Sequence, residues 1–264
     1  MHRIAAVMTA ATLATAAPAD GIEVDLELVL MVDVSRSMTE RELDIQRVGY
    51  AAALRSETVY AAVRSGLLQR VALSYVEWAG AQEVVVDWRL LETREDLEAF
   101  AHTLTAEFNP ALRRTSISEA LIFGAGSIRS NSYDGLRKVI DISGDGPNNE
   151  GRPVLDAREE VLAQGMTING LPLMTREGLG SRWHLDDLDV YYGACVIGGP
   201  GSFAIPVLDW EDFAAAVHRK LVLEIAAVPR SEAVVPVQFA PREPYDCMIG
   251  EKMWEQRRMD WDLR

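Results

Sequence analysis

Leu26-Glu27-Leu28-Val29-Leu30-Met31-Val32-Asp33-Val34-Ser35-Arg36-Ser37 is the stretch that decides the fold. Its first seven residues are mostly apolar, which is typical of a strand buried on both faces of a parallel sheet. Thr39 and Glu42 then form the pattern of a helix capping box. The stretch therefore predicts a strand, a turn and a helix. Asp33, Ser35 and Ser37 lie on the turn, where the carboxyl ends of strands in open α/β sheets bind ligands.

The turn offers one carboxylate and two hydroxyls within five residues. Such hard oxygen donors suit Mg²⁺, Ca²⁺ or Mn²⁺ and are poor ligands for zinc or copper. Aspartate and serine are also common turn residues for purely conformational reasons. This stretch alone leaves a metal site and a plain turn equally open.

The remainder of the chain alternates candidate strands with candidate helices. Only a short turn separates the candidate strands 71–78 and 83–90. They are therefore expected to form an antiparallel hairpin. The alternation predicts an α/β fold with a doubly wound, mostly parallel sheet and one antiparallel edge strand. Further strands are expected at 137–143, 166–173 and 190–197, and helices at 40–65 with a break near Ser56, 93–108, 117–130, 153–164 and 210–225.

The N-terminus has the pattern of a secretory signal peptide. His2-Arg3 is a short basic region, residues 4–16 are apolar or small, and Ala17-Pro18-Ala19 has the form of a cleavage site. The run is too short for a membrane span, and no other segment reaches the ~20 apolar residues that a span requires. We therefore expect a secreted or periplasmic protein that is cleaved near Ala19.

The net charge limits the kinds of partner that we expect. The two cysteines indicate how the domain and the C-terminal segment are connected. The chain has 26 basic and 40 acidic residues and a net charge of −14, which disfavours nucleic acid and anionic membranes as partners. After the leader (1–19) we expect a globular domain (20–228) and a proline-containing C-terminal appendage (229–264). Cys195 and Cys247 are an even number of cysteines in an oxidising compartment, so they are expected to form a disulfide that ties the appendage to the domain.

Two further loops carry oxygen donors, one at the start of a candidate helix and one at the end of a candidate strand. Thr115 opens the apolar helix 117–130, and Asp145 lies in a Gly-Asp-Gly turn after the strand 137–143. With these loops the chain resembles the von Willebrand factor type A domain over roughly residues 24–227. The stretch 33–37 matches the family's Asp-x-Ser-x-Ser signature, and Thr115 and Asp145 match its threonine and second aspartate. The resemblance is nearest to a bacterial secreted branch of unknown function, and it includes the run 191–201.

The resemblance implies a metal-ion-dependent adhesion site (MIDAS). It assigns a divalent cation to five residues and leaves one position of the ion open for an acidic side chain of a partner protein. Mg²⁺ is the expected ion, with Mn²⁺ or Ca²⁺ as alternatives. One departure is Gly144, where the family more often has threonine, so Asp145 can be aimed differently here. The implied ligands are Asp33, Ser35, Ser37, Thr115 and Asp145.

The sequence thus predicts a metal-dependent protein-binding module that is not an enzyme. One alternative is a structural component of an envelope complex, in which the metal only fixes the local fold. Another is a Mg²⁺-dependent phosphohydrolase, which would normally place a second carboxylate near Asp33, where this chain has Ser35. Asp141 either joins the site or points to the opposite layer.

Overall fold

The computed structural model describes residues 21–35, 37–106, 115–175, 184–226 and 244–262, with the side chains of 260–262 left out. The core of this part of the chain is a five-stranded sheet in the order β4-β3-β2-β6-β7. β2 pairs in parallel with β3 and β6, and β6 pairs in parallel with β7. β3 and β4 are antiparallel, which confirms the predicted sheet. The strands are β2 (Leu26–Asp33), β3 (Val71–Trp78), β4 (Gln82–Leu91), β6 (Lys138–Gly144) and β7 (Thr167–Pro172).

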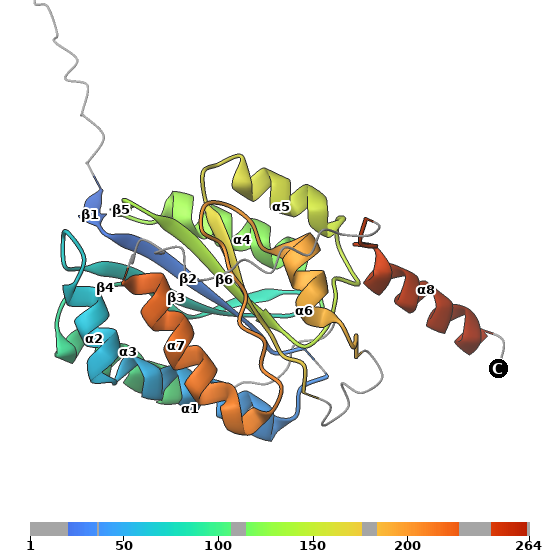
Figure 1. Cartoon of the computed structure of the whole chain (residues 1–264), viewed down its shortest axis with the longest axis horizontal. Coiled ribbons are helices and arrows are strands. Elements are labelled where there is room, and N and C mark those ends of the chain that lie inside the picture. The colour runs from blue at the N-terminus through green and yellow to red at the C-terminus, as the bar shows by residue number, and fades with distance from the viewer. Residues whose placement is uncertain (1–20, 36, 107–114, 176–183, 227–243, 263–264) are drawn as a thin grey trace, which may run out of the picture.

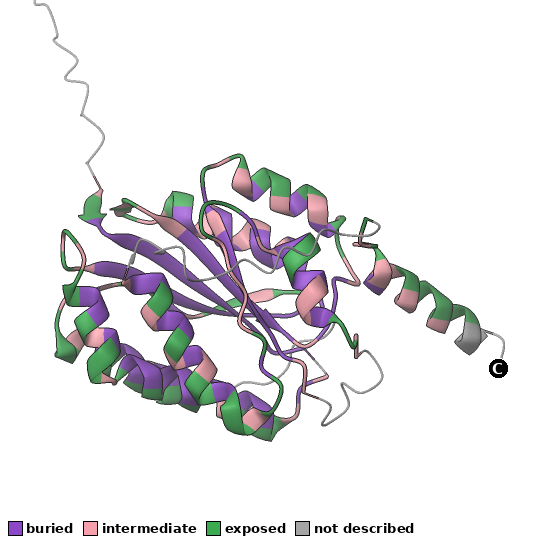
Figure 2. Cartoon of the chain, viewed as in Figure 1, coloured by how far each residue is buried: buried purple, intermediate pink, exposed green. Residues whose placement is uncertain are grey.

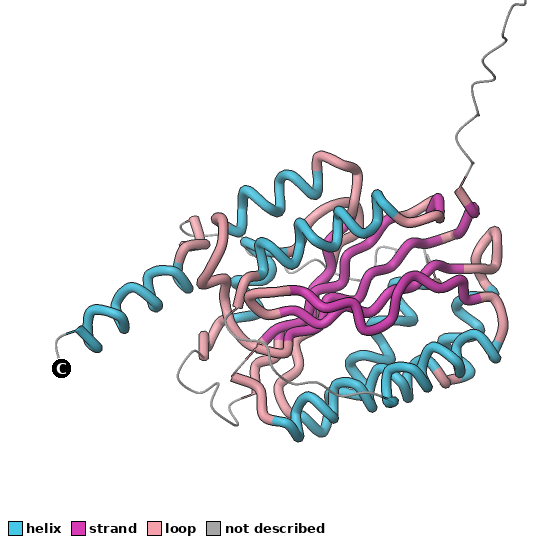
Figure 3. The backbone as a smooth tube through the Cα atoms, turned by 180° about the vertical axis from the view of Figure 1, so that it is seen from behind, coloured by secondary structure: helices cyan, strands magenta, loops and turns pink. Residues whose placement is uncertain are grey.

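Helices cover both faces of this sheet (Figure 1). One layer holds α1 (Glu40–Leu54), α2 (Glu57–Arg64), α3 (Arg94–Ala106) and α7 (Phe213–Ile225). The other holds α4 (Ile117–Ser130), α5 (Val154–Leu162) and α6 (Leu188–Tyr191). The view from behind shows the same two layers on either side of the strands (Figure 3). A separate short parallel pair joins β1 (Ile22–Val24) to β5 (Tyr133–Gly135).

The apolar run of β2 is buried because it faces both layers. Leu28 and Leu30 belong to the core on the α1 and α7 side, whereas Val29 and Met31 belong to the core on the α4 and α5 side. All residues of β2 and β3 are buried, and the central strands are correspondingly purple in Figure 2. β2 is apolar at successive positions because its alternate side chains pack into two different cores, one on each face of the sheet.

The helix that follows β2 begins where the sequence predicts. Thr39 Oγ1 accepts a hydrogen bond from the Glu42 amide at 3.3 Å, and Glu42 Oε2 accepts one from the Thr39 amide at 2.6 Å. The predicted break near Ser56 is also present, because Ser56 is the N-cap of α2. The capping box fixes the direction in which the chain leaves the Asp33 turn.

The predicted strand at 190–197 is wrong. The chain here forms α6 and then a π-helix at Tyr192–Val196. Tyr191, Tyr192, Cys195 and Val196 are buried while the two residues between them are exposed, which is the burial pattern of a helix face. The aromatic and β-branched residues favoured a strand locally, but packing against the α4 and α5 layer decides the conformation.

The C-terminal segment contains a helix that the sequence analysis did not identify, α8 (Ile249–Asp262). It projects away from the two-layered body (Figure 1). Cys195 and Cys247 are joined by a disulfide, and the Tyr245 ring lies 6.1 Å from that of Tyr191. The start of α8 is therefore attached to the π-helix. Within the residues described, no helix has the length and apolar character needed to cross a membrane.

Candidate metal centre

The Asp33 turn is a compact hydrogen-bonded structure at the carboxyl end of β2. Asp33 Oδ1 accepts a hydrogen bond from the Ser35 amide at 2.7 Å, and the Ser35 and Ser37 hydroxyls lie 2.9 Å apart. The Val34 amide donates to the Trp78 carbonyl at 2.9 Å, which fixes the turn against the end of β3. Asp33 and Ser35 are buried, so one carboxylate and two hydroxyls are held together at the sheet edge.

Asp145 reaches the same place from the neighbouring strand. β6 lies beside β2 in parallel, so their carboxyl ends coincide. The Asp145 amide donates to Asp33 Oδ2 at 3.4 Å, and the Ser37 hydroxyl hydrogen-bonds the Asp145 carboxylate. Four of the five predicted ligands thus form one cluster: Asp33, Ser35, Ser37 and Asp145.

Thr115 lies at the edge of this cluster. It is buried, and its carbonyl accepts a hydrogen bond from the Asn149 amide at 3.1 Å. The next residue, Ser116, donates through its amide to the Ala79 carbonyl at 3.2 Å. These bonds place the start of α4 beside the Asp145 loop and the end of β3. Among the described contacts none joins the Thr115 side chain to the other four residues.

The site is electrostatically unfavourable for two bare carboxylates. Burial raises the pKa of Asp33 well above its ordinary value, and the negative charge of Asp145 raises it further. Burial also raises the pKa of Asp145 to about 6, although the hydrogen bond from Ser37 lowers it, and the charge of Glu42 raises it by a smaller amount. A cation placed between the two aspartates would remove this repulsion.

The donor set fits a hard divalent cation. Two carboxylates balance the charge of a dication, and serine and threonine hydroxyls are neutral oxygen ligands of the kind that Mg²⁺ and Ca²⁺ accept. In the part of the chain that the structure describes, no three His, Cys, Asp or Glu side chains gather in a way that could hold a metal.

Gly144 explains how Asp145 is aimed in this chain. A Cβ on Gly144 would lie 2.8 Å from Tyr192 Oη, 3.0 Å from Asp33 Oδ2 and 3.2 Å from Trp78 Cζ2. The space that a threonine side chain would need is therefore filled by the tyrosine hydroxyl and the aspartate. Gly144 and Tyr192 are complementary, and together they let β6 end against the Asp33 carboxylate.

Tyr192 lies beside the cluster and was not among the candidate residues expected from the sequence. Its hydroxyl is buried and, among the described residues, has no hydrogen-bond partner. Burial raises its pKa well above the ordinary value, and Asp33 is the largest charged contributor. The run containing Tyr192 was interpreted as a strand, whereas helical spacing of its buried residues would have turned this side chain toward the sheet. Gln46 was also missed; its amide donates to the Asp33 carbonyl at 3.0 Å.

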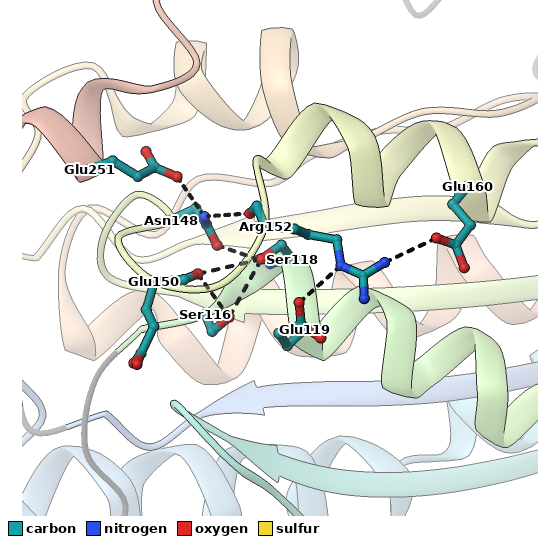
Figure 4. A network of polar contacts seen from close by, with 8 residues as sticks. All are labelled: Ser116, Ser118, Glu119, Asn148, Glu150, Arg152, Glu160 and Glu251. Carbon is teal, nitrogen blue, oxygen red and sulfur yellow. Dashed lines mark hydrogen bonds and ion pairs between the residues drawn. The ribbon is translucent and has the colours of Figure 1, made fainter.

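Asn148 and Asp141 point away from the cluster. Asn148 Oδ1 accepts from the Ser118 amide at 3.0 Å, and its Nδ2 donates to Glu251 Oε1 at 2.7 Å (Figure 4). It therefore fastens the loop after Asp145 to α4 and α8. Asp141 points to the opposite layer, where it contacts Lys220, which is the second of the two interpretations left open by the sequence.

The fold is that of a von Willebrand factor type A-like domain, and comparisons with known proteins agree on the fold. Residues 23–229 match the family described as "Protein of unknown function (DUF1194)". The chain belongs to that family. No match was found among curated proteins.

Three solved structures illustrate the likeness of fold. The pilus adhesin SpaC from Lactobacillus rhamnosus GG is 11% identical with a TM-score of 0.56, covering 76% of this chain and 31% of that one. A von Willebrand factor type A protein from Catenulispora acidiphila is 14% identical with a TM-score of 0.51, covering 76% and 43%. Proximal thread matrix protein 1 from the mussel byssus, with a zinc-occupied MIDAS motif, is 15% identical with a TM-score of 0.51, covering 79% and 49%. The chain thus spans less than half of the length of each of these proteins.

Proposed function

We propose that this protein is a metal-dependent protein-binding module that acts outside the cytoplasm. The observation that carries the proposal is the convergence of β2 and β6. Their adjacent carboxyl ends bring Asp33, Ser35, Ser37 and Asp145 into one hydrogen-bonded cluster. Thr115 completes the ligand set from the start of α4.

The proposed ion is a divalent cation, with Mg²⁺ the first choice and Mn²⁺ or Ca²⁺ the alternatives. It would neutralise the two buried aspartates and supply an electrophilic position at the surface edge of the sheet. A partner protein would present an Asp or Glu side chain to that position. Two proteins of similar fold, a pilus adhesin and a matrix protein with a zinc-occupied MIDAS motif, support this class of function.

We further propose that residues 1–19 are a cleaved leader, that 20–228 form the binding domain, and that 229–264 are an appendage attached through Cys195 and Cys247. This arrangement delivers the domain to the secreted or periplasmic compartment, where the disulfide is stable. No catalytic turnover is proposed. Asp145 does bring a second carboxylate to Asp33, but it is hydrogen-bonded by Ser37 and is explained as a ligand.

Capture from an envelope extract tests the partner. Immobilised protein should retain a specific partner in Mg²⁺ and lose it in EDTA, and the Thr115→Ala and Asp145→Ala variants should not retain it. Asp87→Ala is the matched control, because Asp87 is exposed on β4, the far edge strand. A partner retained equally by all variants and in EDTA would contradict metal-mediated recognition and favour the structural role. Assay of a phosphoester panel should show no turnover.

A further inference from the structure

A second group of ionisable side chains lies buried on the α1 and α7 side of the sheet, apart from the metal centre. It consists of Asp141 on β6 and of Lys220 and Glu224 one turn apart on α7. Lys220 Nζ lies 2.6 Å from Asp141 Oδ1 and 2.5 Å from Glu224 Oε1. The exposed fraction of each side chain is at most 1%. An amine and two carboxyl groups are thus in contact without solvent.

Among the described residues, no second cation is paired with the side chains of this triad. The Phe203 ring centroid lies 5.3 Å from Lys220 Nζ, and the neutral amide of Asn169 donates to Glu224 Oε1 at 2.9 Å. Arg137 donates to the carbonyls of Glu224 and Ile225, and its charge also interacts with that of Glu224. Two acids and one amine in such a setting are costly to keep fully charged.

The contact between Lys220 and Asp141 lacks the alignment of a hydrogen bond. Within the described part of the chain, neither carboxyl oxygen of Asp141 has a hydrogen-bond partner of acceptable geometry, although Nζ lies 2.6 Å from Oδ1. Buried carboxylates are normally satisfied by several donors. The carboxyl group of Asp141 is instead in close contact with the primary amine of Lys220.

We propose that Lys220 and Asp141 condense to an intramolecular isopeptide bond, with Glu224 as the catalytic acid and base. The reactive state is the neutral pair, an amine and a carboxylic acid. Burial lowers the pKa of Lys220, but Asp141 and Glu224 raise it overall, so Nζ first passes one proton to Asp141 within the pair. A bond forms between Lys220 Nζ and Asp141 Cγ while Nζ passes one proton to the Glu224 carboxylate. Glu224 returns that proton to the departing hydroxyl of Asp141. The carbon–oxygen bond breaks, one water leaves, and Glu224 is regenerated.

Each group is suited to its part. Burial and the nearby Asp141 raise the pKa of Glu224 to about 7, a value at which a carboxyl group both accepts and donates a proton near neutral pH. Burial also raises the pKa of Asp141 despite the opposing charge of Lys220, which favours the protonated acid that loses water. Fixing the amine against the carboxyl group replaces a bimolecular encounter with an intramolecular one. Removal of a buried ion pair and release of water favour the product.

The bond would join α7 covalently to β6, the strand that Asp145 directly follows. The cross-link and the metal are independent of each other, since Asp141 points to the layer opposite the metal cluster. The inference therefore does not rest on the proposed function, and either can fail alone.

Peptide mapping of the reduced full-length product tests the proposal. Trypsin should release a branched peptide in which residues 139–158 are joined to residues 220–230, lighter than the two linear peptides together by one water. Asp246 and Lys252 are an internal control, since they form an exposed ion pair at 2.7 Å and should remain unlinked. Recovery of linear 139–158 together with linear 221–230, which requires cleavage after a free Lys220, would overturn the proposal.

A conservative substitution of Glu224 tests its role in the proposed mechanism. Glu224→Gln is nearly isosteric and keeps Lys220 and Asp141, but the amide cannot accept the proton from Nζ. It should give only the linear peptides while its circular dichroism spectrum matches that of the wild type. A branched peptide of equal abundance in Glu224→Gln would contradict the assigned role of Glu224.

Discussion

The amide of Asp145 donates a hydrogen bond to Asp33 Oδ2 at 3.4 Å, although 112 positions separate the two residues in the chain. The bond exists because β2 and β6 are parallel neighbours whose carboxyl ends coincide. It also means that any change in how β6 ends is transmitted directly to the Asp33 carboxylate. Substitutions at Gly144 and at its neighbours are therefore expected to change the metal centre.

Gly144→Ala should destabilise the protein and weaken its binding of divalent cations. The added Cβ would meet Tyr192 Oη at 2.8 Å and Asp33 Oδ2 at 3.0 Å, and overpacking of this kind costs about 1–3 kcal/mol. Denaturant unfolding and calorimetric titration with Mg²⁺ measure the two effects. Gly126→Ala is the matched control, because its nearest contact is a flexible Arg129 nitrogen at 3.9 Å. Equal behaviour of both variants would contradict the close packing at Gly144.

Tyr192→Phe should separate metal affinity from stability. The phenol is buried and lacks a partner among the described residues, so its removal should change the free energy of unfolding of the metal-free protein by less than about 1 kcal/mol. If the hydroxyl orients Asp33 or a metal-bound water, Mg²⁺ affinity should fall by about 10- to 100-fold, as for other groups that support metal ligands. An unchanged affinity measured by titration would show that the hydroxyl does not act on the metal site.

Breaking the disulfide should release the C-terminal segment while the domain keeps its metal affinity. Cys195 and Cys247 close a loop of 52 residues, which corresponds to about 4 kcal/mol in the chain-entropy model. The Cys195→Ser/Cys247→Ser variant should therefore be less stable and should be cut within 244–262 faster than the wild type in limited proteolysis. Cleavage at the same rate in both proteins would indicate that Glu251 and Tyr245 hold α8 without the disulfide.

Much of the fold could be predicted because its signals are local. The apolar run before Asp33, the capping box at Thr39 and the hairpin spacing after Val71 each depend on neighbours in sequence, and the structure contains all three elements. The run at 190–197 was misassigned because its residue types favour a strand, whereas contacts with distant helices determine its helical form. α8 was missed because its apolar residues show no clear face without knowledge of its attachment through Cys247.

The residues that the structure brings together at the candidate site could be grouped from the sequence for a different reason. Asp33, Ser35 and Ser37 are adjacent in a motif, and Asp145 follows a strand that the alternation of elements places beside β2. Tyr192 and Gln46 could not be found in this way. Each acts through a tertiary contact with Asp33 or its turn, and neither residue type is unusual in its own segment.

Calorimetric titration of a divalent cation tests the central claim most directly. The wild-type protein at neutral pH should bind one Mg²⁺ or Mn²⁺ per chain, and the Asp33→Ala/Ser35→Ala variant should bind none while its circular dichroism spectrum remains that of the folded protein. Asp87→Ala/Ser130→Ala changes the same residue types at exposed positions and should bind as the wild type does. Unchanged affinity for both ions in Asp33→Ala/Ser35→Ala would contradict the assignment of the metal to this turn.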